Sequence, residues 1–239
     1  MSRAKKLTQP KFGAKAVEFL NIAYKDYLGA RVLLNAGLLA QGAVLASTAV
    51  EKYFKAILAF RGNEARGHLG KKHINSAMNY DKRLSTTLND SFLSLLQKAY
   101  EIRYLDTLAK EFNIVIANRE FLAELDHTAV TIQESFKMQL DGKDVIFSYD
   151  TDKQNNDPIL MFNNHVLMLQ DKQRFISAEP QIVYELRNCK ARGLMEVTYL
   201  SVARQSDGAF LREGFKCTDE FGTSYQVALA PIHSPNDAA

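Results

Sequence analysis

The chain has 239 residues, of which 46% are apolar and 24% charged, and this composition excludes a collagen-like, low-complexity or disordered protein. Its length suffices for two domains of modest size. The formal net charge of +3 divides unevenly: residues 1–140 carry 20 Lys or Arg against 13 Asp or Glu, or +7, whereas residues 141–239 carry 10 against 14, or −4. Opposite charges indicate two units with different partners, the first of them compatible with a polyanion.

Apolar residues at helical spacing predict a first helix over residues 14–35 and a second over 38–60. Gly37 stands where a left-handed C-terminal cap is expected, and Arg61 and Gly62 end the second helix. Small side chains on the second helix allow another helix to approach closely. They are Ala40, Gly42, Ala43, Ala46 and Ser47.

The next segment, 62–72, is predicted to be a basic loop, followed by a short helix near 73–80 and a polar break over 81–87. A longer helix is expected over 88–108. The last one is centred on residues 122–136 and places its polar face in solvent. That face holds Glu120, Glu124, His127 and Glu134. Together these elements predict an antiparallel bundle of four long helices and a short one.

Beyond residue 140 the pattern changes to short β-prone runs. Strands are expected at 145–149, 159–162, 165–169, 182–186, 196–203, 210–217 and 225–229, with Asn163-Asn164 as a hairpin turn. Residues 177–187 are alternatively a helix entered through Pro180. The predicted fold class is therefore α+β: an N-terminal helical bundle, 1–140, followed by a β-rich domain, 141–239, that is β or α+β.

The run from Asp26 to Gly62 resembles the first two helices of the HEPN family. That family has an acidic residue at the start of an amphipathic helix, a Leu-Leu-x-x-Gly break, and a small-residue helix ending in A-x-E-K-x-x-K-A-x-L. The matching residues here are Ala49, Glu51, Lys52, Lys55, Ala56 and Leu58. Residues 99–104 resemble the aromatic and Arg-Tyr segment of the family, although Leu105 stands where Pro is usual. The resemblance covers about residues 14–140.

This resemblance implies a small all-α domain that usually dimerises and in many members is a metal-independent ribonuclease of toxin–antitoxin, phage-defence or RNA-processing systems. Other members are non-catalytic RNA- or nucleotide-binding modules. Catalytic members carry an Arg and a His separated by four to six residues, late in the bundle and paired across the dimer. The His accepts a proton near neutral pH and the Arg stabilises the phosphate, so no metal or cofactor is expected.

Two pairs of residues have this spacing, Arg61 with His68 and Arg66 with His73, and each pair encloses six residues. Both lie earlier in the chain than the catalytic pair of the family. If the protein is a ribonuclease, we expect Arg61 or Arg66 to stabilise phosphate and His68 or His73 to act as acid and base. The alternative is that both histidines are solvated loop or helix-start residues.

At the late position, Arg119 and His127 enclose seven residues, one more than the family pattern. Eight steps along a continuous helix leave their side chains roughly 80° apart, so they do not converge within one chain. The catalytic motif of the family is therefore not cleanly present.

Arg103 continues the stripe formed by Ala99 and Tyr100, where a guanidinium needs a carboxylate, phosphate or aromatic partner. An ion pair with Glu51 or Asp106 and a contact with phosphate or nucleotide are both open, and Glu51 with Lys55 has the spacing of a supporting helix pair. The loop cations either contact a phosphodiester backbone or are solvated. The residues predicted to bind RNA or nucleotide are Arg103, Tyr104, Lys71 and Lys72.

The leading hypothesis is a cytoplasmic HEPN protein that forms a homodimer through its bundle and engages RNA or nucleotide, with ribonuclease activity as one form of that function. A non-catalytic dimerisation or adaptor module, whose C-terminal domain binds a protein partner, is the alternative. A nucleotide-binding regulator that uses Arg103 is the third. No secretory signal or membrane span is expected, and the two cysteines, Cys189 and Cys217, are too few for a disulfide scaffold.

Overall fold

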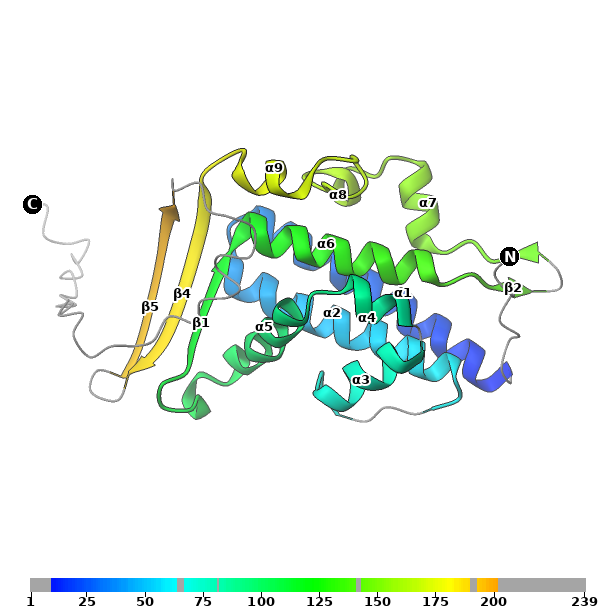
Figure 1. The fold of residues 1–239 in the computed structure, drawn as a ribbon, viewed down its shortest axis with the longest axis horizontal. Coiled ribbons are helices and arrows are strands. Elements are labelled where there is room, and N and C mark those ends of the chain that lie inside the picture. The colour runs from blue at the N-terminus through cyan, green and yellow to red at the C-terminus, as the bar shows by residue number, and fades with distance from the viewer. Residues whose placement is uncertain (1–9, 64–66, 81, 141–142, 190–192, 202–239) are drawn as a thin grey trace, which may run out of the picture.

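The computed structural model describes residues 10–63, 67–80, 82–140, 143–189 and 193–201. Long helices and a small sheet at one end of them make the α+β fold that the sequence predicts (Figure 1). The helices are α1 (Pro10–Asn35), α2 (Leu39–Phe60), α3 (Lys71–Tyr80), α4 (Lys82–Thr87), α5 (Asp90–Glu101), the 3-10 helix η1 (Ile102–Thr107), α6 (Asn118–Ser135), α7 (Ser148–Gln154), α8 (Pro158–Met161) and α9 (Lys172–Ser177). Strands β1 (Asn113–Ala117), β4 (Gln181–Cys189) and β5 (Gly193–Ser201) form an antiparallel sheet in the order β1-β4-β5, and β2 (Gln139–Leu140) pairs with β3 (Lys143–Asp144).

Helices α1 and α2 form a tight antiparallel hairpin, as predicted. Gly37 has φ +81°, and the N–H of Leu38 donates to the carbonyl of Leu33, which closes the end of α1 with the backbone bonds of a glycine C-cap. An added Cβ at Gly42 would lie 2.8 Å from Cγ of Leu34, so the two helices approach at the small residues of α2. Gly62, with φ +80°, ends α2 in the same way.

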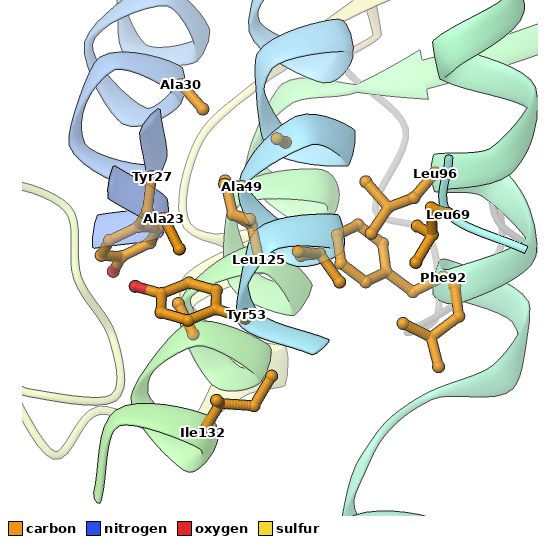
Figure 2. Packing of buried hydrophobic residues seen from close by; sticks show 14 of the residues in the cluster. Ala23, Tyr27, Ala30, Ala49, Tyr53, Leu69, Phe92, Leu96, Leu125 and Ile132 are labelled. Atoms are coloured by element: carbon orange, nitrogen blue, oxygen red, sulfur yellow. The ribbon is translucent and has the colours of Figure 1, made fainter. Parts of the chain in front are cut away.

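Helix α6 lies in the middle of the molecule, with α1 and α2 on one side and α8 and α9 along the other (Figure 1). Its apolar residues meet those of α1 and α2 in one core (Figure 2). Because elements pack on several sides of α6, the prediction that Glu120 and Glu124 face solvent is wrong, since both are buried. Glu124 accepts from Nδ2 of Asn89 at 2.8 Å and from Nζ of Lys172 at 2.5 Å, which offsets its desolvation.

The helix expected over 88–108 is shorter than predicted. It begins at Asp90 and stops at Glu101, and η1 follows with a non-helical Tyr104 (φ −126°, ψ 63°). The polar break predicted over 81–87 holds α4, and residues 113–117 form a strand, β1, that the sequence analysis did not predict. Strand β1 brings the end of α5 and η1 to the edge of the sheet.

Beyond residue 140, the strands expected at 145–149, 159–162 and 165–169 are wrong. Asp150 accepts from the N–H of Phe147 and starts α7, whereas Asp157 accepts from the N–H groups of Ile159 and Leu160 and starts α8. Asn163 ends α8 with φ +55° instead of turning a hairpin. The strands expected at 182–186 and 196–203 correspond to β4 and β5, so a helix over 177–187 is also wrong. Those expected at 210–217 and 225–229 lie outside the described residues.

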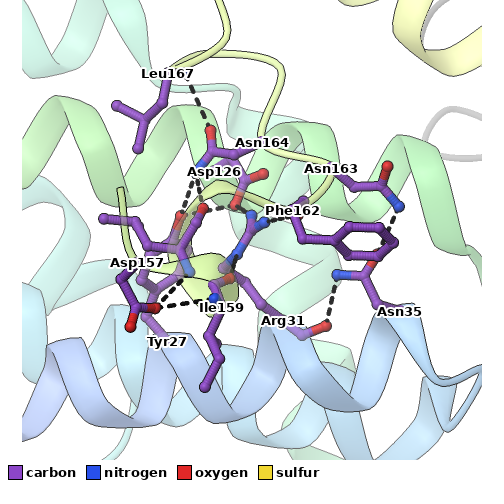
Figure 3. Close-up of polar contacts among 11 residues, drawn as sticks. Tyr27, Arg31, Asn35, Asp126, Asp157, Ile159, Phe162, Asn163, Asn164 and Leu167 are labelled. Atoms are coloured by element: carbon purple, nitrogen blue, oxygen red, sulfur yellow. Dashed lines mark hydrogen bonds and ion pairs between the residues drawn. The ribbon is translucent and has the colours of Figure 1, made fainter. Parts of the chain in front are cut away.

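A buried polar network fastens the segment 158–164 to the bundle (Figure 3). Arg31 of α1 pairs with Asp126 of α6 and donates to the carbonyls of Ile159 and Phe162. Tyr27 donates to the same carboxylate at 2.7 Å. Together with the pairing of β1 with β4, this network connects the two sides of residue 140, and a division into domains at that residue stays a prediction. No helix in the described ranges has the length and hydropathy to span a membrane.

Candidate nucleic-acid interface

A pair of rings, the exposed His68 and the half-buried Tyr100, lies where the loop after α2 meets the end of α5. The rings of His68 and Tyr100 are 4.4 Å apart between centroids and inclined by 31°, and Nε2 of His68 is 3.0 Å from the Tyr100 hydroxyl. Leu69 is buried and anchors the loop in the core beside Leu96 and Phe92, so His68 next to it is held at the surface (Figure 2).

The segment at the kink adds the guanidinium of Arg103 and a third ring, that of Tyr104, to this pair. The Cζ of Arg103 lies 5.0 Å from the ring centroid of Tyr100 and 5.7 Å from that of Tyr104. The two tyrosine rings are 6.2 Å apart in an edge-to-face arrangement. We call His68, Tyr100, Arg103 and Tyr104 the aromatic–cation surface.

Neither carboxylate proposed as a partner of Arg103 pairs with it. Within the described chain, the contacts of Arg103 are the two tyrosine rings, and its side chain is exposed. A guanidinium over aromatic faces keeps its N–H donors at the edge of the stack, where they are available to an anion.

Glu51 of α2 lies behind the aromatic–cation surface and orients His68. Its Oε2 accepts from the N–H of Leu69 at 3.0 Å and lies 3.5 Å from Nδ1 of His68, and its Oε1 pairs with Lys55 at 2.6 Å. A carboxylate facing Nδ1 favours the proton on that nitrogen, which leaves Nε2 to accept from the Tyr100 hydroxyl. Burial first, and then the interaction with Tyr104, raise the pKa of Tyr100, so this hydroxyl keeps its proton near neutral pH.

The predicted cations around this surface lie at two helix ends. Lys71 and Lys72 are exposed in the first turn of α3, which holds no acidic residue, although cations there oppose the helix dipole. Because Lys71 follows His68 by three residues, their Cα atoms are at most about 11 Å apart. His73 is half-buried in the same turn, and Arg61 is exposed at the C-cap of α2. Arg66 lies outside the described residues.

The late pair of Arg119 and His127 does not converge. Arg119 is buried, donates to the carbonyl of Phe175 and pairs with Glu179, whereas Nε2 of His127 lies 3.1 Å from the carbonyl of Thr87. Each side chain therefore serves packing between α6 and its neighbours. The structure brings His68, Arg103 and Tyr104 together and leaves Arg119 and His127 out.

Two residues of this site, Tyr100 and the supporting Glu51, were not among the predicted site residues. The spacing of Glu51 and Lys55 predicts a helix pair, which the structure confirms. Its contact with the loop at residues 68–69 is the part that was missed. The ring of Tyr100 is in the Arg-Tyr segment, and the signal was its position three residues before Arg103.

The fold is an antiparallel helical bundle with a small antiparallel sheet at one end. Residues 16–133 match the model of the HEPN domain. This part of the chain belongs to the HEPN family. No curated protein and no solved structure matches the chain, and the C-terminal part has no family match.

Proposed function

We propose that this HEPN protein binds single-stranded RNA through its aromatic–cation surface. The observation that carries the proposal is the cluster of His68, Tyr100 and Tyr104, with the guanidinium of Arg103 near the faces of the two tyrosine rings and with His68, Arg103 and Tyr104 exposed. Proteins that hold single strands combine ring faces for the bases with cations for the backbone. Lys71 and Lys72 extend the positive charge from this stack along the start of α3.

The test is fluorescence anisotropy of a labelled single-stranded RNA in buffer of about 50 mM salt. Replacing Tyr100 by Ala removes the ring between His68 and Arg103, and we expect a loss of about 5- to 150-fold in affinity, since one base–ring stack is worth about 1–3 kcal/mol. Phe162→Ala is the matched control, because Phe162 is an exposed ring at the C-cap of α8 and does not belong to the aromatic–cation surface. Equal losses in both variants, or no binding by the native protein, contradict the proposal and leave the adaptor hypothesis.

Metal-independent RNA cleavage is a second candidate, and the pairing of Glu51 with His68 favours it. A 2′-hydroxyl that replaces the Tyr100 hydroxyl at Nε2 gives its proton to His68. Its oxygen then bonds to phosphorus as the bond to the 5′-oxygen breaks, and that oxygen takes up a proton. Arg103 would stabilise the charge on the phosphate. Cleavage in EDTA with 2′,3′-cyclic phosphate ends, lost in His68→Ala but kept in His73→Ala, supports this candidate, and equal activity in both variants removes it.

The predicted homodimer belongs to the same proposal. Val32 and Leu38, at the end of the α1–α2 hairpin, are 49% and 50% exposed, and apolar side chains of this size on a helix end favour contact with a second chain. Light scattering measures the mass directly, and a monomer at micromolar concentration contradicts the dimer. A role in toxin–antitoxin or phage-defence systems and a protein partner for the C-terminal part stay predictions.

A further inference from the structure

A groove of about 670 Å³ opens beside the aromatic–cation surface. It lies between the N-terminal half of α2, η1 and the strands β4 and β5. Arg103 belongs to both places, because it lines the groove and also contacts the ring of Tyr100. Cavities of this size are typical of sites for small organic groups. An RNA strand on the stack therefore passes the mouth of this groove.

The walls of the groove suit a flat heterocycle. Val44 and Leu45 of α2 and Ile102 and Leu105 of η1 give it apolar walls, and Leu105 is 48% exposed, so its side chain is available to a ligand. The hydroxyl of Thr48 is used by the carbonyl of Val44, which leaves this part of the wall apolar. Burial of a base between such side chains is favourable at about 25 cal/mol for each Å² removed from water.

The polar end of the groove presents one carboxylate that has no cation partner in the described chain. Asp26 is paired with Lys52 at 2.5 Å, whereas Glu196 on β5 has no such ion pair. Tyr184 on β4 and Glu196 on β5 both line the groove, and since Tyr184 is opposite Thr198, two residues from Glu196, their side chains lie on the same face of the sheet. Burial, and then the charge of Glu196, raise the pKa of Tyr184, in agreement with this proximity. A carboxylate in this position accepts hydrogen bonds from the exocyclic amino group of a base and repels a carbonyl oxygen at the same ring position, such as O4 of uracil.

We propose that this groove receives one unpaired base of the bound RNA and that Glu196 selects a base with an exocyclic amino group. The inference rests on the proposed RNA binding and adds base selection to it. Arg103 connects the two sites, because it can hold the phosphate of the nucleotide that turns from the stack into the groove. The stack supplies affinity without sequence preference, and the groove supplies the preference.

The experiment compares labelled C10 and U10 RNAs, two pyrimidine strands whose bases differ at C4, which carries an amino group or a carbonyl, and at N3, which is an acceptor or an N–H donor. We expect the native protein to bind C10 about tenfold more tightly than U10, because a good base-edge contact is worth about 1–3 kcal/mol. In Glu196→Gln the ratio falls to about one, since an amide donates to uracil as well as it accepts from cytosine. Glu134→Gln, at an exposed carboxylate on α6, is the matched control and keeps the native ratio.

The outcomes separate this inference from the function on which it rests. Equal binding of C10 and U10 by the native protein, with both weakened in Tyr100→Ala, overturns the groove and keeps the RNA-binding proposal. Failure to bind either RNA overturns both. Stronger binding of both RNAs to Glu196→Gln by the same factor reports only the lost negative charge and overturns base selection. A further outcome also overturns base selection: Leu105→Ala changes the mass measured by light scattering but leaves the ratio of the C10 and U10 affinities unchanged. The groove is then an interface between copies of the chain.

Discussion

Arg31 and Asp126 form an ion pair whose two side chains are fully buried. Removing one partner leaves a charge in the core without compensation, which in proteins costs about 3–5 kcal/mol. We therefore expect Asp126→Ala to lower the free energy of unfolding by about this amount, measured by urea denaturation. The loss includes release of the segment 158–164, because Arg31 also holds the carbonyls of Ile159 and Phe162 (Figure 3).

A partly exposed ion pair that also involves α1 serves as the control. Lys52 and Asp26 join α2 to α1 with side chains 26% and 19% exposed, and Asp26→Ala should cost less than about 1 kcal/mol. Arg31→Met combined with Asp126→Leu should be less destabilised than Asp126→Ala, since no lone charge remains. If Asp126→Ala costs no more than Asp26→Ala, the buried pair does not hold the segment.

His165 makes stability depend on pH. It is 4% exposed, stacks on Phe175 with centroids 5.5 Å apart, and burial, followed by the charge of His127, lowers its pKa to about 4. The unfolded state takes up a proton below pH 6.5 and the folded state does so only near pH 4, so stability falls as the pH is lowered through this window. At pH 4.5 the loss from this residue is about 2–3 kcal/mol relative to neutral pH.

The measurement is urea unfolding at pH 7.5 and pH 4.5. His165→Phe keeps a ring on Phe175 but does not titrate, so its stability should fall less between the two values than that of the native protein. The exposed His68, replaced by Gln, is the control and should keep the native pH dependence. An equal fall in the native protein and His165→Phe would show that carboxylates alone set the dependence.

Among the helices, α5 has a side-chain cap that also contacts α6. Oδ1 of Asn89 accepts from the N–H of Ser91 at 2.9 Å, and its Nδ2 donates to Glu124 at 2.8 Å. Asn89→Ala should cost about 1–2 kcal/mol of unfolding free energy, because it removes the cap and a partner of a buried carboxylate. Asn89→Ser keeps a capping oxygen that is too short to reach Glu124 and should recover part of that loss. A cost within error of zero for Asn89→Ala would show that packing alone fixes the start of α5.

The elements that could be predicted from the sequence are those specified by local signals. The helical spacing and the glycines at 37 and 62 were enough for α1 and α2. Short apolar runs such as 145–149 and 159–162 fit a strand or a helix equally well, and the acceptors Asp150 and Asp157 decided for helices. The burial of Glu120 and Glu124 depends on elements that precede α6 in the chain and on others that follow it. The periodicity of α6 alone therefore does not predict this burial.

The candidate site could be predicted from the sequence only in part. His68 was chosen for its spacing from Arg61, and Arg103 and Tyr104 for the Arg-Tyr segment. Their grouping depends on contacts among residues 51, 68 and 100, which lie far apart in the chain. The surface therefore became visible only with the fold.

For the whole molecule, the uneven charge predicts how RNA binding responds to salt. Three exposed cations, Lys71, Lys72 and Arg103, lie on or near the aromatic–cation surface. For single strands the logarithm of the affinity falls by about 0.7 per neutralised phosphate for each tenfold rise in salt, so three contacts predict a loss of about 20-fold between 50 and 200 mM. With Lys71 and Lys72 both replaced by Ala, the loss over the same range should shrink to about threefold.

The control for this measurement is a second pair of exposed lysines away from α3, Lys143 beside β2 and Lys153 on α7 (Figure 1). Replacing both by Ala changes the net charge by the same amount, so it separates a local contact from the field of the whole protein. We expect this variant to keep the 20-fold salt dependence. If it loses as much salt dependence as the variant at Lys71 and Lys72, the RNA responds to overall charge, and the start of α3 has no particular role in holding its backbone.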